Sequence, residues 1–448
     1  MPLTGIEIYK LLPQTNCKEC GDPTCLAFAM KLAAGKTELA LCPYLSEEAK
    51  AKLEEASAPP IRVVTIGVGD RVVKIGGETV MFRHEKRFEN PPGFAVLISD
   101  TMDEAEVDEK LVRFSQLQYE RVGVALRPEL VALRNDSGEA EKFEALVNKV
   151  TQKSDASIIL MSSNPDILAT GLKTCVDRKP LLYAAIKENV ARLADLAKEN
   201  SCPVVAKASS LEELTQLTTE LTEAGVKDIV LDSGSRTLRR AFEDQVFIRR
   251  AALVKKFRPL GFPTIVFPSE MTNDPMKEAV IASLFVAKYG GIIVLSDFRG
   301  ESLFPLLVER MNVYTDPQRP LATTEGIYKI GDVDENSPVL ITTNFSLTYF
   351  IVSGEIEASK VPTYLLVKDT EGLSVMTAWA AGKFVADAIA PFVKKSSIAD
   401  QVKHHKLVIP GYAAPESSGL EDELPGWEIL VGPREASNIP AYLKGWKP

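Results

Sequence analysis

The sequence predicts an α/β protein in three parts: a small cysteine-rich module, a central barrel of alternating strands and helices, and a smaller C-terminal α/β sheet. Three observations support this fold class. Four of the six cysteines lie within the first 42 residues. Apolar strand-like runs then alternate with helical patterns as far as residue 313, and four further strand–helix repeats follow a segment rich in Pro, Thr, Gly and Asp.

Composition limits the class of protein. The chain has 448 residues, enough for two or three domains, with 45% hydrophobic and 25% charged residues. Its net charge of −9 disfavours nucleic-acid and membrane-surface binding. Residues 1–10 lack the pattern of a signal peptide, and the apolar stretch 279–295 is interrupted by Lys288 and a Gly pair. We therefore expect a cytoplasmic protein with no membrane span and no bound nucleic acid.

The N-terminal cysteines follow the pattern C-x2-C-x4-C-x16-C-P. Short helices are expected at residues 6–12 and 26–34, with a loop between them. Because thiolates converge most easily where the backbone turns, this loop suits metal ligation. The predicted ligands are Cys17, Cys20, Cys25 and Cys42.

Two metal centres compete for these ligands. Structural zinc usually uses two C-x2-C knuckles, and this chain has one. Three closely spaced cysteines with a remote Cys-Pro are more typical of a [4Fe–4S] cluster, which is the preferred interpretation. A disulfide or a chance grouping is the remaining alternative. Cys175 and Cys202 are expected to be buried structural thiols.

Domain limits follow from linker composition. The cysteine module spans residues 1–57 and ends in a predicted helix at 46–57, and residues 58–60 (Ala-Pro-Pro) form a linker. The barrel occupies residues 61–313, a second linker occupies 314–336, and the C-terminal domain occupies 337–448.

A (β/α)8 TIM barrel is predicted for the middle of the chain. A hairpin at 62–68 and 72–82 precedes it. Several of the runs that follow are apolar throughout, as in parallel strands buried on both faces. An open doubly wound sheet is the alternative. The predicted strands are 94–99, 122–126, 157–161, 181–185, 204–208, 229–232, 264–267 and 292–296.

Polar residues follow most of these strands, at the end where barrels place their chemistry. They also match ordinary helix caps and turns, so no catalytic residue is assigned. The candidates are Ser99-Asp100, Arg127-Pro128, Ser162-Ser163-Asn164, Lys207, Asp232-Ser233, Glu270 and Asp297.

The C-terminal domain is expected to have strands at 339–343, 364–367, 406–409 and 428–431, as in a small Rossmann-like or flavodoxin-like sheet. Ligands of such sheets bind beyond the carboxyl ends of the strands. A helix at 375–392 begins with small residues that would let a flat ligand approach its backbone. Caps and turns are again the alternative interpretation. The predicted binding residues are Thr342, Thr343, Asn344, Phe345, Ser346, Thr370, Gly372, Leu373, Ser374, Val375, Met376, Thr377, Gly411, Tyr412, Ala413, Ala414, Gly432, Pro433, Arg434 and Glu435.

The sequence resembles the large (γ) subunits of corrinoid iron–sulfur proteins of the acetyl-CoA (Wood–Ljungdahl) pathway. The features that carry the resemblance are the motif Cys17-x2-Cys20-Gly-Asp-Pro-Thr-Cys25 with Cys42-Pro43, the barrel, and the C-terminal segments 342–346 and 372–377. The resemblance covers the whole chain. The cysteine motif is specific to these proteins and their relatives in acetyl-CoA decarbonylase/synthase complexes, whereas the barrel is not specific.

The resemblance implies a methyl carrier. Cobalt of a B12-type corrinoid on the C-terminal domain accepts a methyl group from methyltetrahydrofolate through a separate methyltransferase. The methyl group then passes to acetyl-CoA synthase of the CO dehydrogenase/acetyl-CoA synthase system. The resemblance also implies a heterodimer with a smaller barrel subunit. The [4Fe–4S] cluster would relay low-potential electrons that restore cobalt(I) from inactive cobalt(II).

Histidine usage bears on the corrinoid. Many B12 methyltransferases supply a lower ligand from D-x-H-x-x-G, a motif that is absent here. His404 and His405 precede a predicted strand and so lie at its wrong end. A base-off corrinoid without a protein imidazole is therefore expected, with Ser374 or Thr377 bordering the lower cobalt face. The alternative functions are an iron–sulfur electron-transfer protein and an autonomous pterin-dependent methyltransferase.

Overall fold

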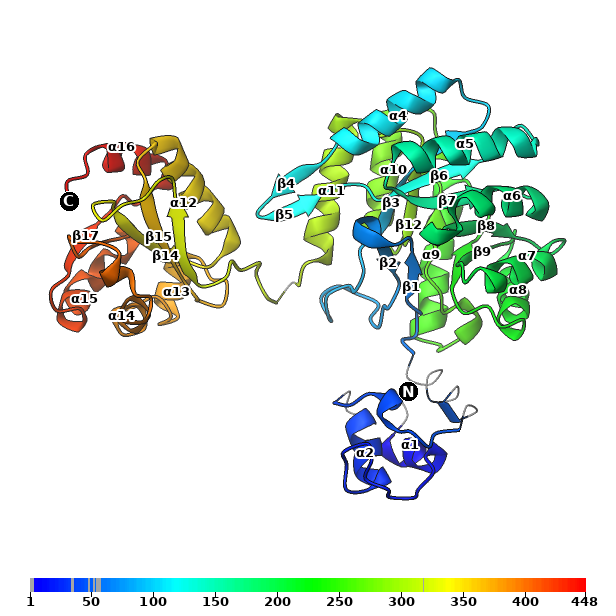
Figure 1. Cartoon of the computed structure of the whole chain (residues 1–448), viewed down its shortest axis with the longest axis horizontal. Helices are drawn as coiled ribbons and strands as arrows, with labels where there is room; N and C mark the ends of the chain where they lie inside the picture. Colours follow the sequence, from blue (N-terminus) through cyan, green and yellow to red (C-terminus); the bar gives the residue numbers. More distant parts are fainter. Residues whose placement is uncertain (1–3, 34–35, 47–48, 51–52, 54–57, 317) are drawn as a thin grey trace. The chain divides into compact units, whose positions relative to one another are not determined.

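The structure is a computed structural model that describes residues 4–33, 36–46, 49–50, 53, 58–316 and 318–448 (Figure 1). The helix predicted at 46–57 lies largely outside these residues. The chain divides into two compact units, and each is described by itself. The first comprises Met1–Met81, Glu89–Gln116 and Pro128–Leu306, and the second comprises Phe82–Phe88, Leu117–Arg127 and Leu307–Pro448.

Two short helices form the cysteine module. Helix α1 (Gly5–Leu11) begins at Thr4, whose side chain and that of Glu7 make a reciprocal capping box. Helix α2 (Cys25–Ala33) packs its buried Phe28 and Ala29 against the first helix. A 3-10 turn, η1 (Leu39–Leu41), then leads to Cys42. The small apolar core of this module therefore forms directly beside the cysteines.

Eight parallel strands within the described residues form a barrel, so the predicted TIM barrel is confirmed. The sheet order is β10-β9-β8-β7-β6-β3-β12-β11, and a bridge between Leu231 and Thr264 joins its two ends. This closure excludes the open doubly wound sheet. The strands are β3 (Gly93–Ser99), β6 (Leu130–Arg134), β7 (Ser157–Met161), β8 (Leu181–Ala185), β9 (Val204–Lys207), β10 (Ile229–Asp232), β11 (Ile265–Val266) and β12 (Ile292–Leu295).

The prediction that 122–126 forms a strand of the barrel was wrong. Val122 and Gly123 both have positive φ, and they form the turn of a separate hairpin made by β4 (Tyr119–Arg121) and β5 (Val124–Leu126). The barrel strand in question is β6, which begins after Pro128. Arg127-Pro128 therefore precedes a strand and does not lie at its carboxyl end.

The predicted N-terminal hairpin closes one end of the barrel. Strands β1 (Val64–Ile66) and β2 (Val73–Ile75) pair antiparallel, with η2 (Gly69–Arg71) between them. Their alternate side chains are buried in the same core as the inward residues of the barrel. Ser157, the first residue of β7, donates to the Arg71 carbonyl, so the hairpin covers the amino ends of the strands. The carboxyl ends remain on the opposite side.

Helices follow the barrel strands in alternation (Figure 1). In the described part of the chain, none of the helices combines the length and apolar character needed to cross a bilayer. The barrel helices are α4 (Glu104–Gln116), α5 (Ala140–Lys153), α6 (Pro165–Cys175), α7 (Val190–Glu199), α8 (Leu211–Glu223), α9 (Leu238–Leu253), α10 (Pro275–Ala287) and α11 (Gly300–Tyr314).

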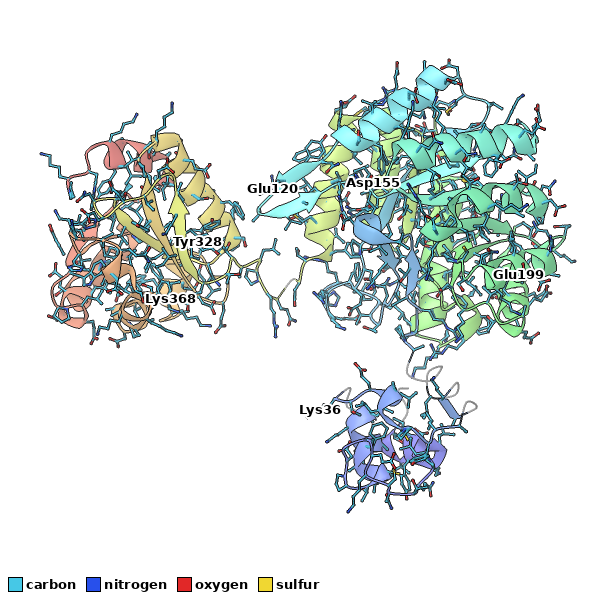
Figure 2. The ribbon with its side chains drawn as sticks, in the orientation of Figure 1. Lys36, Glu120, Asp155, Glu199, Tyr328 and Lys368 are labelled. Atoms are coloured by element: carbon cyan, nitrogen blue, oxygen red, sulfur yellow. The ribbon has the colours of Figure 1, made fainter. Side chains whose placement is uncertain are left out.

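The C-terminal sheet contains all four predicted strands. Its order is β13-β15-β14-β16-β17, with the last four strands parallel. Strand β13 lies inside the segment predicted as a linker and pairs antiparallel with β15, so those residues belong to the sheet. Tyr328 on β13 and Lys368 at the end of β15 are labelled in Figure 2. The strands are β13 (Gly326–Ile330), β14 (Val339–Thr343), β15 (Thr363–Lys368), β16 (Lys406–Ile409) and β17 (Glu428–Val431).

Helices cover both faces of this sheet. Helices α12 (Ser346–Ser359) and α16 (Ile439–Lys444) pack on one face. On the other face lie α13 (Val375–Ala380), α14 (Ala386–Lys395) and α15 (Ser417–Glu423). The single helix predicted at 375–392 was wrong, because it is broken between α13 and α14, where Gly382 has a φ of +69°. The domain therefore consists of three layers, with one sheet between two layers of helices.

Candidate functional site

The carboxyl edge of the C-terminal sheet has a topological switch point. Strand β14 lies centrally, with β15 on one side and β16 on the other. The chain therefore leaves β14 toward one face and leaves β16 toward the other, and the loops that follow these strands diverge. Open α/β sheets bind ligands in the crevice that this divergence creates. The predicted loops after β14 and β16 flank this position.

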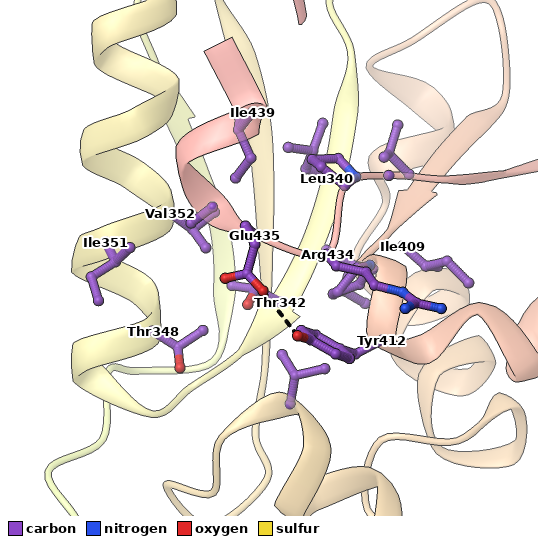
Figure 3. Close-up of a pocket in the computed structure, with 17 residues that line it drawn as sticks. Leu340, Thr342, Thr348, Ile351, Val352, Ile409, Tyr412, Arg434, Glu435 and Ile439 are labelled. Carbon is purple, nitrogen blue, oxygen red and sulfur yellow. Dashed lines mark hydrogen bonds between the residues drawn. The ribbon is translucent and has the colours of Figure 1, made fainter. Parts of the chain in front are cut away.

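A pocket of about 300 Å³ opens beside this edge (Figure 3). Its wall is mostly aliphatic, with a few polar groups at the rim. Tyr412 donates a 2.9 Å hydrogen bond to Glu435, which raises the pKa of the phenol, and Arg434 lies over the Tyr412 ring. The wall consists of Leu340, Ile341, Thr342, Thr348, Ile351, Val352, Val375, Val408, Ile409, Pro410, Tyr412, Gly432, Pro433, Arg434, Glu435, Ala436 and Ile439.

Thr342 gives the pocket a buried polar group. Its side chain is 1% exposed, and within the described part of the chain its hydroxyl has no hydrogen-bond partner. A buried hydroxyl without a partner costs about 1–3 kcal/mol, so a ligand or water that formed a hydrogen bond to it would recover that free energy. The hydroxyl of Thr343 is also unpartnered among the described residues, but this residue lies outside the pocket wall.

Asn344 organises the neighbouring loop. Its side-chain carbonyl accepts hydrogen bonds from the backbone N–H groups of Thr370 and Gly372, at 2.9 and 3.0 Å. Its amide donates to Asp369 at 2.8 Å. Gly372 has a φ of +73°, which glycine adopts without steric cost. Asn344 therefore acts as a scaffold that holds the loop after β15 against the end of β14.

Gly411 shows how closely two of the predicted loops approach. A Cβ atom at this position would lie 2.7 Å from the backbone nitrogen of Arg434 and 2.8 Å from the carbonyl oxygen of Gly432. The loops after β16 and β17 therefore pack backbone against backbone. This contact sets the position of Arg434 and Glu435 at the pocket rim.

The start of α13 carries the residues predicted to border a ligand. The hydroxyls of Ser374 and Thr377 are 3.1 Å apart and exposed. Met376 is 56% exposed, whereas Val375 lines the pocket. The first turn of α13 thus offers two hydroxyls and an uncovered apolar side chain to any ligand that extends beyond the pocket.

The predicted binding residues divide into two groups. Those that line the pocket are Thr342, Val375, Tyr412, Gly432, Pro433, Arg434 and Glu435. The others stand around it or support it from the core, and their contact with a ligand stays a prediction. They are Thr343, Asn344, Phe345, Ser346, Thr370, Gly372, Leu373, Ser374, Met376, Thr377, Gly411, Ala413 and Ala414.

Sequence reasoning missed the contribution of α12. Thr348, Ile351 and Val352 line the pocket, although no strand-end rule points to them. Their i, i+3, i+4 spacing was a usable indication of a common helix face. Ile351 is 47% exposed even though it is apolar, which also fits a surface that a ligand or partner covers.

Three of the four predicted ligands, Cys20, Cys25 and Cys42, belong to or pack against the apolar core of the cysteine module. Cys25 is buried at the first position of α2, and Cys20 and Cys42 pack against the same apolar cluster. Burial raises the pKa of the Cys42 thiol, a backbone N–H of Tyr44 opposes this, and the other three cysteine thiols raise it further. The Cys42 thiol is therefore close enough to each of the other three to interact with it electrostatically. In the described residues, no group of three or more His, Cys, Asp or Glu side chains is arranged to hold a metal ion.

The loop that carries Cys17 and Cys20 suits an anionic centre. Gln14, Asn16, Lys18 and Gly21 all have positive φ, the left-handed conformation that occurs in backbone nests, where neighbouring N–H groups point toward one bound group. Such nests bind anions and iron–sulfur clusters. The Asn16 N–H already donates to Cys25 Sγ at 3.4 Å. The donor set and the backbone therefore fit an iron–sulfur cluster, and the assignment of the ligands stays a prediction.

Polar groups at the carboxyl end of the barrel satisfy one another. Tyr183 donates to Asp232 at 2.7 Å, and Arg236 donates to the same carboxylate at 2.8 Å. Burial is the largest cause of the raised pKa of Tyr183, and Asp232 adds to it. Glu270 accepts from both Arg134 and Arg236. Arg134 was not predicted, because the strand that carries it was misplaced.

Comparison with known proteins covers nearly the whole chain. The family described as CO dehydrogenase/acetyl-CoA synthase delta subunit matches residues 63–443, and the one described as a putative Fe-S cluster matches residues 12–44. The "Corrinoid/iron-sulfur protein large subunit" of Moorella thermoacetica is 46% identical over 99% of both chains. This chain belongs to the corrinoid/iron–sulfur protein large-subunit family. The predicted resemblance is confirmed.

The chain is also similar to other subunits. The "Acetyl-CoA decarbonylase/synthase complex subunit gamma" of Methanopyrus kandleri is 38% identical over 99% of this chain and 97% of its own length. Among solved structures, a 7,8-dihydropteroate synthase from Vibrio fischeri matches 57% of this chain and all of its own, at 12% identity and a TM-score of 0.39. That likeness carries no argument about function.

Proposed function

We propose that this chain carries a methyl group on a corrinoid bound by its C-terminal domain. The methyl group would pass from a methyltetrahydrofolate methyltransferase to acetyl-CoA synthase. A [4Fe–4S] cluster on the four N-terminal cysteines would serve the reductive reactivation of the cobalt. The observation that carries the proposal is the 46% identity to the M. thermoacetica large subunit, which extends over both the cysteine module and the C-terminal domain. The partners would be a smaller barrel subunit, the methyltransferase, and the CO dehydrogenase/acetyl-CoA synthase.

The corrinoid would supply a nucleophilic cobalt that takes up and releases the methyl group. The residues at the pocket fit such a ligand, because a corrinoid combines apolar rings with many amide groups. The aliphatic wall would take an apolar part of the cofactor, and the unpartnered Thr342 hydroxyl would bond to a polar part. Exposed Met376 and Tyr412 would cover the portion that extends beyond the pocket.

Histidine positions support a base-off corrinoid without a protein imidazole. His405 directly precedes β16, and His404 Nε2 lies 3.0 Å from the carbonyl oxygen of Ser337, a residue just before β14. Both therefore lie at the amino ends of the strands, away from the pocket. The hydroxyl of Ser374 or that of Thr377, which lie 3.1 Å apart, would instead border the lower cobalt face, directly or through water.

The cluster would hand single electrons to the cofactor when the cobalt has lost its reactive state. The four cysteines would supply its thiolates, and the nest around Asn16 would supply backbone N–H groups to the sulfurs. The two sites belong to separate compact regions of the chain, each with its own core. This division suits a carrier that must meet several partners in turn.

The test is anaerobic purification of the chain together with its smaller subunit, followed by visible spectroscopy and metal analysis. We expect corrinoid absorption bands and iron and cobalt in the proportion of one cubane to one corrinoid. Iron without corrinoid, even after incubation with hydroxocobalamin and reductant, would contradict the methyl-carrier proposal and favour an electron-transfer protein. Methyl transfer from methyltetrahydrofolate to free cobalamin by this chain alone would favour a barrel methyltransferase.

A further inference from the structure

We infer that Asn16 is a positioning residue for the iron–sulfur cluster, which holds the Cys25 ligand in place and donates a hydrogen bond to its sulfur. The inference rests on the proposed function, because it presupposes that the four cysteines bind the cluster. It goes further by assigning a role to a residue that is not a ligand. The role can be measured at the cluster itself, independently of methyl transfer.

Two reciprocal hydrogen bonds join Asn16 to Cys25. The backbone N–H of Asn16 donates to Cys25 Sγ at 3.4 Å, within the range for sulfur acceptors. The side-chain carbonyl of Asn16 accepts from the Cys25 backbone N–H at 2.8 Å. Each residue is therefore fixed by the other, over nine positions of sequence. If the side-chain bond is lost, the N–H loses the restraint that aims it at the sulfur.

The backbone at Asn16 explains why asparagine suits this position. Its φ is +50°, in the left-handed region that few residues other than Gly, Asn and Asp adopt readily. In this conformation the backbone N–H of Asn16 points toward Cys25 Sγ. Asparagine thus supplies the unusual backbone and the acceptor for Cys25 together, whereas glycine supplies only the backbone.

Cys25 needs an external acceptor because of its place in α2. It is the first residue of the helix, so its N–H has no partner within the helix. Asn16 satisfies that donor from outside. The ligand is thereby held at both its backbone and its sulfur, and an N–H bond to sulfur stabilises the more negative, reduced cluster.

Gln14 in the same loop provides a matched control. It also has a positive φ, of +56°, and it also carries a side-chain amide. Its amide donates to the carbonyl of Tyr9 on α1 and not to Cys25. Substitution of Gln14 by glycine therefore makes the same chemical change in the same loop while leaving the hydrogen bonds to Cys25 in place.

The experiment compares Asn16→Gly, Asn16→Asp and Gln14→Gly with the native chain, each co-purified with the smaller subunit under anaerobic conditions. Electron paramagnetic resonance gives the midpoint potential of the cluster in a redox titration, and the decay of its visible absorption in air gives the rate of cluster loss. We expect a more negative potential and roughly fivefold faster loss in Asn16→Gly, the effect of one hydrogen bond of ordinary strength. Asn16→Asp, which keeps an acceptor oxygen, should restore the slow loss, and Gln14→Gly should match the native chain.

Native potential and native loss rate in Asn16→Gly would overturn the inference. Equal changes in Asn16→Gly and Gln14→Gly would also overturn it, because the effect would then belong to the loop in general. If Asn16→Gly does not fold, fast cluster loss in a folded Asn16→Asp would count against the role of the acceptor oxygen. A native chain that holds no cluster would instead overturn the proposed function, so the two failures are distinguishable.

Discussion

The side-chain carbonyl of Asn344 accepts a 2.9 Å hydrogen bond from the backbone N–H of Thr370, and this contact joins the ends of two neighbouring strands. Asn344 directly follows β14, and Thr370 lies in the loop between β15 and α13. The same oxygen accepts from the Thr370 hydroxyl at 3.1 Å. One buried side chain thus shapes the loop that leads to Ser374 and Thr377.

Replacement of Asn344 by alanine should release this loop. The buried N–H groups of Thr370 and Gly372 would lose their acceptor, which should lower the free energy of unfolding of the domain by about 2–3 kcal/mol. We also expect weaker corrinoid retention, measured as the cobalt that remains after gel filtration. Asn336→Ala, at the opposite edge of the sheet, is the control. Unchanged retention with a lower stability would show that the loop does not contact the cofactor.

Thr342 and Thr343 allow a matched pair of substitutions. Each hydroxyl is buried and unpartnered among the described residues, so valine at either position should leave the stability of the cofactor-free chain unchanged or slightly higher. Only Thr342 lines the pocket, and Thr342→Val should therefore weaken corrinoid binding by roughly tenfold, the effect of one lost hydrogen bond to a ligand. Titration with the cofactor measures the affinity of both variants. An equal loss of affinity in Thr343→Val would assign the effect to packing.

Cys20→Ser should separate the two proposed sites. A serine hydroxyl is a poor substitute for a thiolate ligand, so the cubane should be lost or altered. A chain loaded beforehand with a methyl group should still pass it on, whereas reactivation of oxidised protein by a low-potential donor should fail. Cys175→Ser provides the control, because Cys175 is buried in the barrel with a pKa raised to about 12 by burial. Reactivation that survives in Cys20→Ser would refute the role given to the cluster.

Acid stability of the barrel should depend on Asp100. Burial by itself would raise its pKa, but hydrogen bonds from the side chains of Ser137 and Asn135 and from nearby backbone N–H groups outweigh burial and keep the pKa below its usual value. A carboxyl group whose pKa is lowered in the folded state stabilises the fold at pH values above its unfolded pKa. This stabilisation is lost as the pH falls through the folded pKa, below about pH 4.

Asp100→Asn should therefore cost about 1–3 kcal/mol in the free energy of unfolding at neutral pH. It should also flatten the dependence of stability on pH in the acid range. Denaturant unfolding at a series of pH values measures both effects. Asp195→Asn, on the exposed side of α7, should resemble the native chain. A steep acid dependence that persists in Asp100→Asn would assign it to another carboxylate.

Prediction from sequence succeeded where the local pattern and the tertiary structure agree. Strands β7, β8, β10, β14, β16 and β17 fall at the predicted residues, because long apolar runs between turn residues have few other ways to be buried. The predictions at 122–126 and 375–392 failed at residues with positive φ, Val122 and Gly382. A β-branched residue such as Val122 rarely adopts positive φ, so the sequence does not predict a turn there. One glycine such as Gly382 in a run of helix-forming residues is only a weak indication that the helix ends.

The chain order of residues was sufficient to reveal the four clustered cysteines, the barrel repeat and the family, since each is a matter of spacing along the chain. The pocket depended on packing. Thr348 and Ile351 reach it only because α12 lies across β14, and the Thr342 hydroxyl is unpartnered only because the residues around it bury it. The pairing of Asn16 with Cys25 likewise needs a left-handed backbone that brings together residues nine positions apart. Spacing is local information, whereas burial and hydrogen-bond partners arise only when distant segments meet.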